Sequence, residues 1–194
     1  MKWCLLLLCT GLVFGGQVRA DVPGGYDAEV LQYDDGTAGW ITWGGTYRGV
    51  WFNTQDFNPS SIGFALEQME YWFYNSGWTT DQFYSEIWNG DDTGPVPPRL
   101  VQKIVVAIHY APCYHIFNPP LDVEQNFWGV VNTKRSTGGW PSILGDNTPE
   151  EHSFFSDDMI TWEPWELGDY FIRAHGEFAS SFDAGSWGSI KALF

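Results

Sequence analysis

The chain has 194 residues, of which 24 are Asp or Glu and 9 are Lys or Arg, so its formal net charge is −15. Proteins bind phosphate-rich partners through Lys and Arg, and this charge therefore argues against nucleic acid and anionic membrane surfaces as partners. Cations and neutral ligands remain compatible with it.

The first twenty residues have the pattern of a secretory signal peptide. Lys2 supplies a positive charge, Cys4–Phe14 is a leucine-rich stretch too short to span a bilayer, and Val18–Ala20 has the small residues that precede signal-peptidase cleavage. We therefore expect residues 1–20 to be removed and the product to be secreted, either extracellular or at the cell surface.

Residues 21–194 are expected to form a single domain, because their number suits one hydrophobic core. No stretch in this range is apolar enough to span a membrane. Cys113 is the one cysteine in it, so the mature chain cannot form an internal disulfide. Aromatic residues at 18%, with 12 Trp and 22 Gly, are typical of an all-β domain with a core of large rings.

Short strands are expected from the start of this domain. Val30–Tyr33 is a strand candidate, and Asp34–Gly36 predicts the tight turn that ends it. Trp40–Trp43 and Tyr47–Asn53 flank Gly44–Gly45, which predicts a hairpin with a short glycine loop.

The segment Ile62–Phe73 admits two interpretations. Its apolar residues alternate as in a strand, but the alternation slips by one residue after Leu66, which a strand accommodates only with a bulge or bend. A helix over Gly63–Tyr74 is the competitor, since Leu66, Met69 and Phe73 also fit a helical stripe. The aromatic content favours the strand.

The middle of the chain holds the clearest strand signals. Phe83–Trp88 has aromatic and β-branched content, and it runs into Asn89–Pro95, a cluster of acidic and glycine turn residues that must end it. Ile104–Tyr110 alternates regularly and predicts a further strand.

Proline then interrupts the pattern. Pro112, Pro119 and Pro120 are expected to break the chain, because proline cannot donate to a sheet ladder. Further strands are expected at Phe127–Asn132, Met159–Trp165 and Tyr170–His175.

Eight to ten short strands joined by Gly, Pro and Asp loops predict the fold class. We expect two antiparallel sheets packed face to face, an all-β sandwich that is jelly-roll-like.

Several segments carry a resemblance to a known kind of module. They are YDDGTAGW, EIWNGDDTGP, FWGVV, PSILGDNTP, HSFFSDD, EPW and GDYFIRA, in this order along the chain. Together they resemble a β-sandwich module of secreted bacterial proteins, often large cell-surface or extracellular ones. The resemblance implies a fold and brings no shared catalytic residue with it.

Acidic loops suggest a calcium site. Calcium takes several oxygen ligands from Asp, Asn and backbone carbonyls. The candidate ligands are Asp34, Asp35, Asp91, Asp92, Asp146, Asp157 and Asp158. Their spacing does not match an EF-hand loop, and the alternative is that these carboxylates bond to the backbone of their own turns.

Carbohydrate binding is the leading functional hypothesis. A sugar ring offers an apolar face to an aromatic side chain and hydroxyls to nearby acids and amides. The candidate platform residues lie in or beside loops: Trp78, Trp140, Trp162 and Trp165. The alternative for each of them is packing in the core or between the sheets.

Catalytic patterns are weak. His109, His115, His152 and His175 lack the spacing of a zinc motif, and there is no nucleophile elbow. Cys113 and His115 can share a strand face, but a lone cysteine is more often a buried thiol. Two facing carboxylates of a glycosidase are not visible in a sequence. Arg173 is expected to pair with an acid.

The sequence thus favours a non-catalytic secreted module that binds carbohydrate, another extracellular polymer or a surface protein. The alternatives are a structural or assembly subunit of the cell surface and, with less support, a hydrolase. An exposed sheet edge would favour assembly, and an aromatic groove with polar neighbours would favour sugar.

Overall fold

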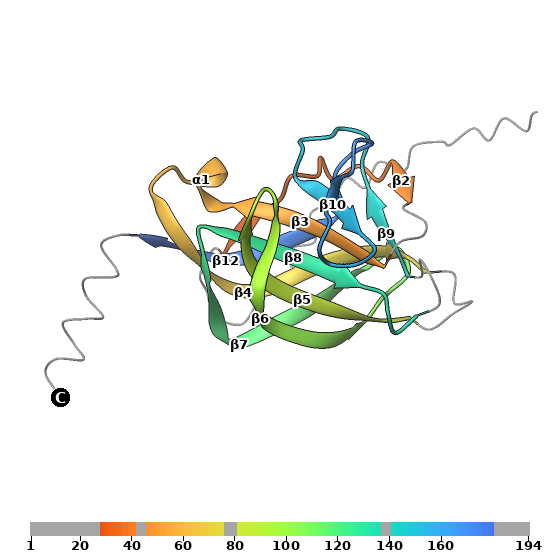
Figure 1. The fold of residues 1–194 in the computed structure, drawn as a ribbon, viewed down its shortest axis with the longest axis horizontal. Helices are drawn as coiled ribbons and strands as arrows, with labels where there is room; N and C mark the ends of the chain where they lie inside the picture. The colour runs from red at the N-terminus through yellow and green to blue at the C-terminus, as the bar shows by residue number, and fades with distance from the viewer. Residues whose placement is uncertain (1–27, 42–45, 76–80, 137–140, 181–194) are drawn as a thin grey trace, which may run out of the picture.

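The computed structural model describes residues 28–41, 46–75, 81–136 and 141–180 (Figure 1). The expected signal segment and two candidate residues, Trp78 and Trp140, lie outside this part of the chain. The described residues form an all-β sandwich of two antiparallel six-stranded sheets, as the sequence predicted. The only helix among them is α1 (Thr54–Phe57), capped by the Asn53 side chain.

The first sheet has the order β1-β12-β4-β9-β2, with β7 paired to β4. Its strands are β1 (Glu29–Leu31), β2 (Trp40–Ile41), β4 (Ser61–Tyr74), β7 (Pro112–Glu124), β9 (Ser142–Gly145) and β12 (Ile172–Ser180). The second sheet has the order β11-β10-β3-β8-β5-β6. Its strands are β3 (Tyr47–Asn53), β5 (Gln82–Asp91), β6 (Gly94–Val106), β8 (Asn126–Asn132), β10 (Ser153–Ser156) and β11 (Glu163–Pro164).

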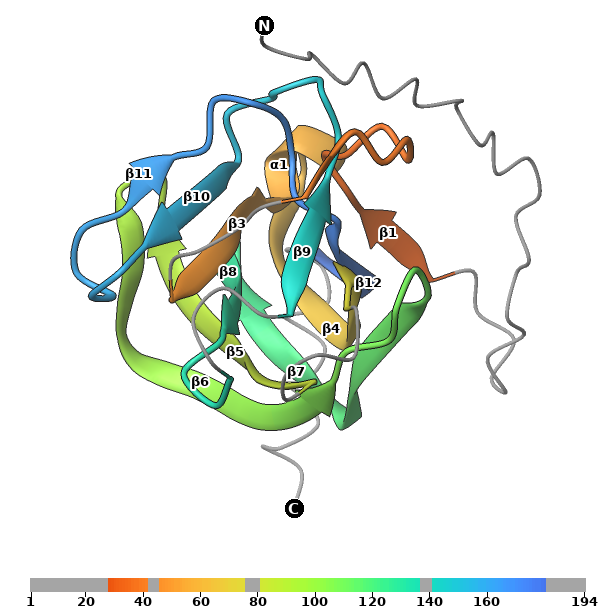
Figure 2. The same cartoon turned by 90° about the vertical axis from the view of Figure 1, so that its right-hand side faces the viewer.

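The described strands number twelve, and two of them, β2 and β11, are only two residues long. Without these two, the count falls within the expected eight to ten. The chain crosses between the sheets repeatedly, as in a jelly-roll-like sandwich. Figure 2 shows the two sheets on opposite sides of the core.

The core lies between the sheets and is built from rings. Strand alternation directs one face of each strand inward. The fully buried rings include Phe52, Phe64, Tyr71, Phe73, Phe83 and Phe127. Phe52 and Phe127 stack with centroids 5.0 Å apart across the β3–β8 pair, and Phe73 and Phe83 lie 4.7 Å apart across the two sheets. Large aromatic rings therefore supply much of the packing between the two sheets.

Strand β4 confirms the strand interpretation of its segment. The helix over Gly63–Tyr74 is not formed, and the slip after Leu66 appears as a register shift against β7 between Leu66 and Gln68. The bulge absorbs the extra residue, so Leu66 and Met69 both reach the core.

The prolines do not break the chain where they were expected to. Strand β7 runs from Pro112 to Glu124 and includes Pro119 and Pro120. Within the described residues β7 pairs only with β4, and the shift in that pairing skips the residues between Ile116 and Leu121. An edge strand tolerates proline where no ladder hydrogen bond is required of it.

The predicted hairpin around Gly44–Gly45 is also wrong. Strand β2 pairs with β9 in the first sheet, whereas β3 pairs with β8 and β10 in the second. Gly44 and Gly45 themselves lie outside the described residues. The expected strand Met159–Trp165 is reduced to β11, and the residues before it form a loop.

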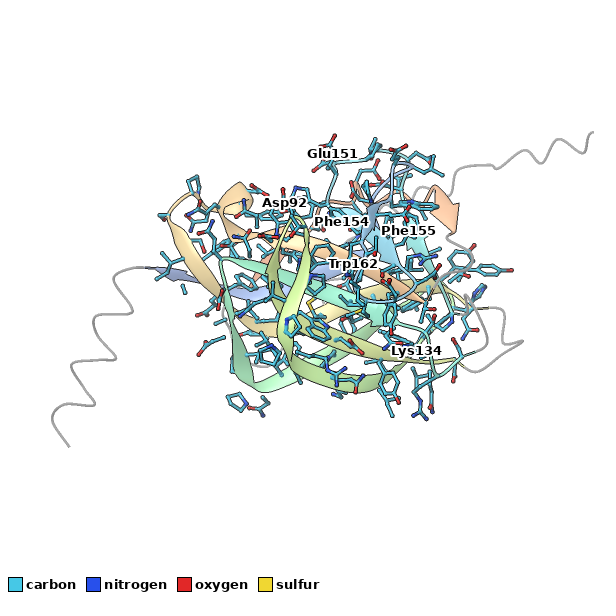
Figure 3. The ribbon with its side chains drawn as sticks, viewed as in Figure 1. Asp92, Lys134, Glu151, Phe154, Phe155 and Trp162 are labelled. Carbon is cyan, nitrogen blue, oxygen red and sulfur yellow. The ribbon has the colours of Figure 1, made fainter. Side chains whose placement is uncertain are left out.

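This loop covers part of the outer face of the second sheet. Tyr47, Trp128, Val130 and Phe154 form a second apolar cluster there, and Met159 and Trp162 of the loop pack on it (Figure 3). The Asp158 carboxylate accepts the backbone N–H groups of Ile160 and Thr161, each at 2.8 Å, and so fixes the loop. The rest of the outer face stays open to solvent.

None of the helices in the described part of the chain is long and apolar enough to cross a membrane.

Candidate ligand-binding site

Three of the predicted calcium ligands come together at one end of the sandwich. Asp146 Oδ2 accepts the backbone N–H of Asp35 at 2.8 Å, and Thr148 Oγ1 donates to Asp35 Oδ2 at 3.2 Å. Asp34 is instead occupied by Arg173, whose Nε donates to Asp34 Oδ2 at 2.9 Å. The expected pairing of Arg173 with an acid is thus confirmed.

A fourth carboxylate, Asp169, belongs to this end and was missed from the sequence. Its backbone N–H donates to Asp146 Oδ1 at 2.7 Å, and its Oδ1 accepts from Ser153 Oγ at 2.8 Å. Burial raises the pKa of Asp169 and of Asp34. Asp169 is visible in the sequence as one acid among many, but nothing local in the sequence indicates that its side chain is buried.

The remaining candidates lie in separate turns. Asp91 Oδ1 accepts the N–H and the hydroxyl of Thr93 in the β5–β6 turn, where Asp92 is exposed (Figure 3). Asp157 Oδ1 accepts the N–H of Thr46 at 3.2 Å. The bonds of Asp91 are those of an acidic turn, whereas the bond of Asp157 joins two segments that are distant in the sequence.

Within the described ranges, no group of three or more His, Cys, Asp or Glu side chains has an arrangement that could hold a metal ion. The calcium site stays a prediction.

The two described tryptophan candidates are partly buried in packing contacts. The Trp162 ring lies on Trp128 with centroids 5.0 Å apart, and a Cβ on Gly49 would approach Trp162 Cζ3 to 3.1 Å. Trp165 packs against Phe155 and Tyr170 at the other end of β10. Trp162 still contributes to a site indirectly, because it holds the loop that carries Met159.

Cys113 and His115 share the inward face of β7, but their side chains have different partners. Cys113 Sγ donates to the Tyr71 carbonyl at 3.4 Å, and burial raises the pKa of the thiol to about 12. His115 Nδ1 lies 2.8 Å from Ser85 Oγ, which is itself 2.5 Å from the Tyr71 hydroxyl. All four side chains are buried between the sheets, so this polar chain is closed to a substrate.

The open part of the second sheet's outer face forms a groove of about 370 Å³. Strand alternation brings outward-facing residues of β3, β8, β5 and β6 together there, and Met159 closes one side. We call it the outer groove, and the residues that line it are Tyr47, Tyr84, Glu86, Trp88, Arg99, Gln102, Asn132, Lys134 and Met159.

Glu86 lies at the centre of the outer groove and is 1% exposed. Its Oε1 accepts from Gln102 Nε2 at 2.7 Å, Asn132 Nδ2 at 2.8 Å and Arg99 Nη1 at 3.2 Å. Its Oε2 accepts from Trp88 Nε1 at 3.1 Å. Four donors from three strands thus hold one carboxylate, and the carboxylate fixes their side chains in turn.

Three aromatic rings surround this polar centre, and a basic side chain lies over each ring. Lys134 Nζ lies 5.0 Å from the Tyr47 ring, and the Arg99 guanidinium lies 5.6 Å from the Trp88 ring. Arg135, at the rim, lies 5.4 Å from the Tyr84 ring. Cation–π contacts of this kind hold long side chains in place beside the rings.

A second depression, of about 560 Å³, lies between the β5–β6 turn and the β7–β8 turn. Its lining combines the apolar side chains of Pro97, Pro98 and Leu100 with the carboxylates of Asp91 and Glu124 and with the amides of neighbouring Asn and Gln residues. Its lining contains no aromatic residue. The outer groove therefore has the stronger chemistry for a ligand.

The residues of the outer groove were missed from the sequence, although a signal was present. The predicted strand Phe83–Trp88 alternates Phe83 and Ile87, which face the core, with Tyr84, Glu86 and Trp88, which face outward. A solvent-side face that combines two rings and a carboxylate is unusual for a plain structural strand.

Comparison of the chain with protein-family models, with curated proteins and with solved structures found no match.

Proposed function

We propose that this chain is a secreted, non-catalytic β-sandwich module that binds a carbohydrate or another extracellular polymer in the outer groove. The signal-peptide pattern and the resemblance to secreted bacterial modules support export. One observation carries the binding proposal: three aromatic rings, those of Tyr47, Tyr84 and Trp88, border a groove whose floor is a fixed set of polar groups.

The groove has the two parts that sugar recognition needs. The partly exposed rings of Tyr84 and Trp88 offer apolar surface against which a pyranose can pack, and this packing excludes water from both surfaces. Gln102 and Asn132 are each held by a bond to Glu86, so the exposed amide of Gln102 is already oriented when a ligand arrives. Preorganised groups lose less conformational entropy on binding.

The test is a titration with soluble polysaccharides by calorimetry or affinity electrophoresis, using Trp88→Ala and a matched control, Trp72→Ala. Trp72 lies on the outer face of the other sheet and donates from Nε1 to Glu70, two positions earlier, as Trp88 donates to Glu86. The two variants thus remove the same local contact from opposite faces.

We expect Trp88→Ala to weaken binding about tenfold, because stacking on a ring contributes roughly 1 kcal/mol or more. Trp72→Ala should bind as the wild type does. Equal binding by all three proteins would contradict the proposal.

A second candidate function is assembly through β6. Within the described residues this strand pairs only with β5, and its outer positions expose Val96, Leu100, Ile104 and Val106. An exposed edge with apolar side chains can pair with another strand, although Pro97, Pro98 and Lys103 on the same strand oppose such pairing. Analytical ultracentrifugation over a range of concentrations separates the two: a monomer at all of them would rule out self-assembly through this edge.

A further inference from the structure

The charges of the chain are distributed unevenly. Acidic residues outnumber basic ones by 24 to 9 over the whole sequence. Of the six Lys and Arg residues in the described ranges, Arg48 is buried and Arg173 is bound to Asp34 and Glu70. The four exposed ones are Arg99, Lys103, Lys134 and Arg135. Three of these, all but Lys103, lie in or at the rim of the outer groove.

Two of these cations have no carboxylate partner in the described part of the chain. Lys134 lies over the Tyr47 ring, and Arg135 bonds to Gln82 Oε1 at 3.0 Å and to the Tyr84 hydroxyl at 3.2 Å. The Tyr47 side chain raises the pKa of Lys134, so its ammonium keeps its proton at neutral pH. Figure 3 shows Lys134 just beyond the end of β8, close to β5 and β6.

The one carboxylate of the groove, Glu86, can offset only one of the three cations. Glu86 Oε1 accepts from Arg99 in an ion pair of 3.2 Å and from two amides, and Glu86 Oε2 accepts from Trp88. Its charge is thus matched by Arg99, and its acceptor positions are already used. The charge left at the groove is that of Lys134 and Arg135, which is positive.

From this placement we infer that the outer groove selects an acidic polysaccharide, one whose sugars carry carboxylate or sulfate groups, over a neutral one. The inference rests on the proposed function of the groove and names its substrate class. A pyranose packed against the partly exposed Tyr84 would place its ring substituents beside Arg135, and Lys134 lies in the same groove, so an anionic substituent can pair with either cation.

The acidity of the rest of the molecule does not prevent this. At physiological ionic strength charges are screened over about 8 Å, so the cations at the groove dominate the field that a bound sugar meets. A densely charged nucleic acid would extend beyond the groove and meet the acidic surface. An acidic polysaccharide has fewer charges per unit length and also has apolar ring faces, so it suits a groove lined by both cations and aromatic rings better than nucleic acid does.

The experiment uses two pairs of polymers that differ only in charge. Polygalacturonate is compared with its methyl ester, and dextran sulfate with dextran, so that the carboxylate and the sulfate source are tested separately. A single-stranded DNA oligonucleotide serves as a polyanion without sugar rings available for stacking in this way. Each is titrated against the full mature chain at low and at physiological salt.

We expect at least one acidic polymer to bind more tightly than its neutral counterpart, with an affinity that falls as salt rises. The double variant Lys134→Gln/Arg135→Gln should lower that affinity roughly fivefold, since each exposed ion pair contributes a factor of a few. Lys103→Gln is the matched control. Lys103 is an exposed cation on the same sheet that lies outside the groove, and its removal should have no effect.

The possible failures can be told apart. Equal binding of acidic and neutral polymers, lost in Trp88→Ala, would overturn the charge selectivity and leave the proposed function standing. Absence of binding to all four polysaccharides would overturn both. Binding of the DNA as tightly as of the acidic polysaccharides would overturn the assignment to sugar and make the site a general polyanion site.

Discussion

His115 makes the stability of the sandwich depend on pH in a predictable way. The side chain is 3% exposed and contacts Ser85 in the middle of the core. Burial, together with the charge of Lys103, lowers its pKa from 6.5 to about 4. The folded protein therefore holds His115 neutral at pH values where the unfolded chain would already protonate it.

The direction and size of the effect follow from linkage. Between about pH 6.5 and pH 4 the unfolded state binds one more proton at this residue than the folded state does, so stability falls as pH falls. A difference of about 2.5 pKa units at 1.36 kcal/mol each amounts to a loss of ~3 kcal/mol by pH 4. That is a large share of the 5–15 kcal/mol that stabilises a typical domain.

The assay is urea unfolding followed by tryptophan fluorescence at several pH values between about 7 and 4, for the wild type and for His115→Asn. Asparagine places an amide near the position of Nδ1, so Ser85 keeps a polar neighbour. The variant should be less stable than the wild type at neutral pH, by about 1 kcal/mol. Its stability should fall by ~3 kcal/mol less than that of the wild type between neutral pH and pH 4, so the two curves should cross and the variant should be the more stable protein by ~2 kcal/mol at pH 4.

Burial raises the pKa values of Asp34 and Asp169, so these groups also make stability depend on pH, but they are common to both proteins and cancel in the difference. His109→Asn serves as the control that removes an exposed histidine. Parallel curves for the wild type and His115→Asn would refute the argument that a neutral His115 is held in the core.

Three further changes test the packing. Gly168 has φ of +152°, and a Cβ there would collide with a backbone carbonyl, so Gly168→Ala should lower the unfolding free energy by about 3 kcal/mol. Gly36 has φ of +79° with open space around it, so Gly36→Ala should lower the unfolding free energy by only about 1 kcal/mol. Urea titrations measure both changes. Arg173→Met should cost roughly 3 kcal/mol because it leaves the buried Asp34 unpaired, and a change below 1 kcal/mol would argue that the pair contributes little. Trp162→Ala should cost about 3 kcal/mol by opening a cavity over the second apolar cluster, and an unchanged thermal midpoint would show that the ring is not a packing element.

The strands themselves could largely be predicted because their signal is local. Phe127–Asn132 and Phe83–Trp88 are recovered as β8 and β5, since β-branched and aromatic residues alternate within a single segment. The slip in Ile62–Phe73 was also visible, and the structure places a bulge there.

Strand partners could not be predicted, because they are set by distant segments. Gly44–Gly45 has the composition of a hairpin turn, yet β2 and β3 belong to different sheets. Strand β2 pairs with β9 and strand β3 pairs with β8, and both partners lie far along the sequence. Proline was expected to break the strand because it has no N–H to donate. The missing N–H matters only where a neighbouring strand needs that hydrogen bond. Whether β7 lies at an edge is a property of the whole sheet.

The candidate site shows the same limit. Tyr84, Glu86 and Trp88 alternate within one strand, so the sequence shows that they share a face. The donors to Glu86, however, include Asn132 and Gln102 from two other strands. The part of the outer face that stays open is decided by where the loop with Met159 and Trp162 lies. Only the register of four strands brings these groups into one groove.

The most direct measurement of the central claim is a two-dimensional ¹H–¹⁵N spectrum recorded during titration with oligogalacturonate. The groove presents amide and indole N–H groups that such a spectrum resolves individually. We expect the Trp88 indole and the side-chain amides of Gln102 and Asn132 to shift, while the Trp72 indole on the opposite sheet stays in place. Saturable shifts confined to residues outside the outer groove would contradict the account.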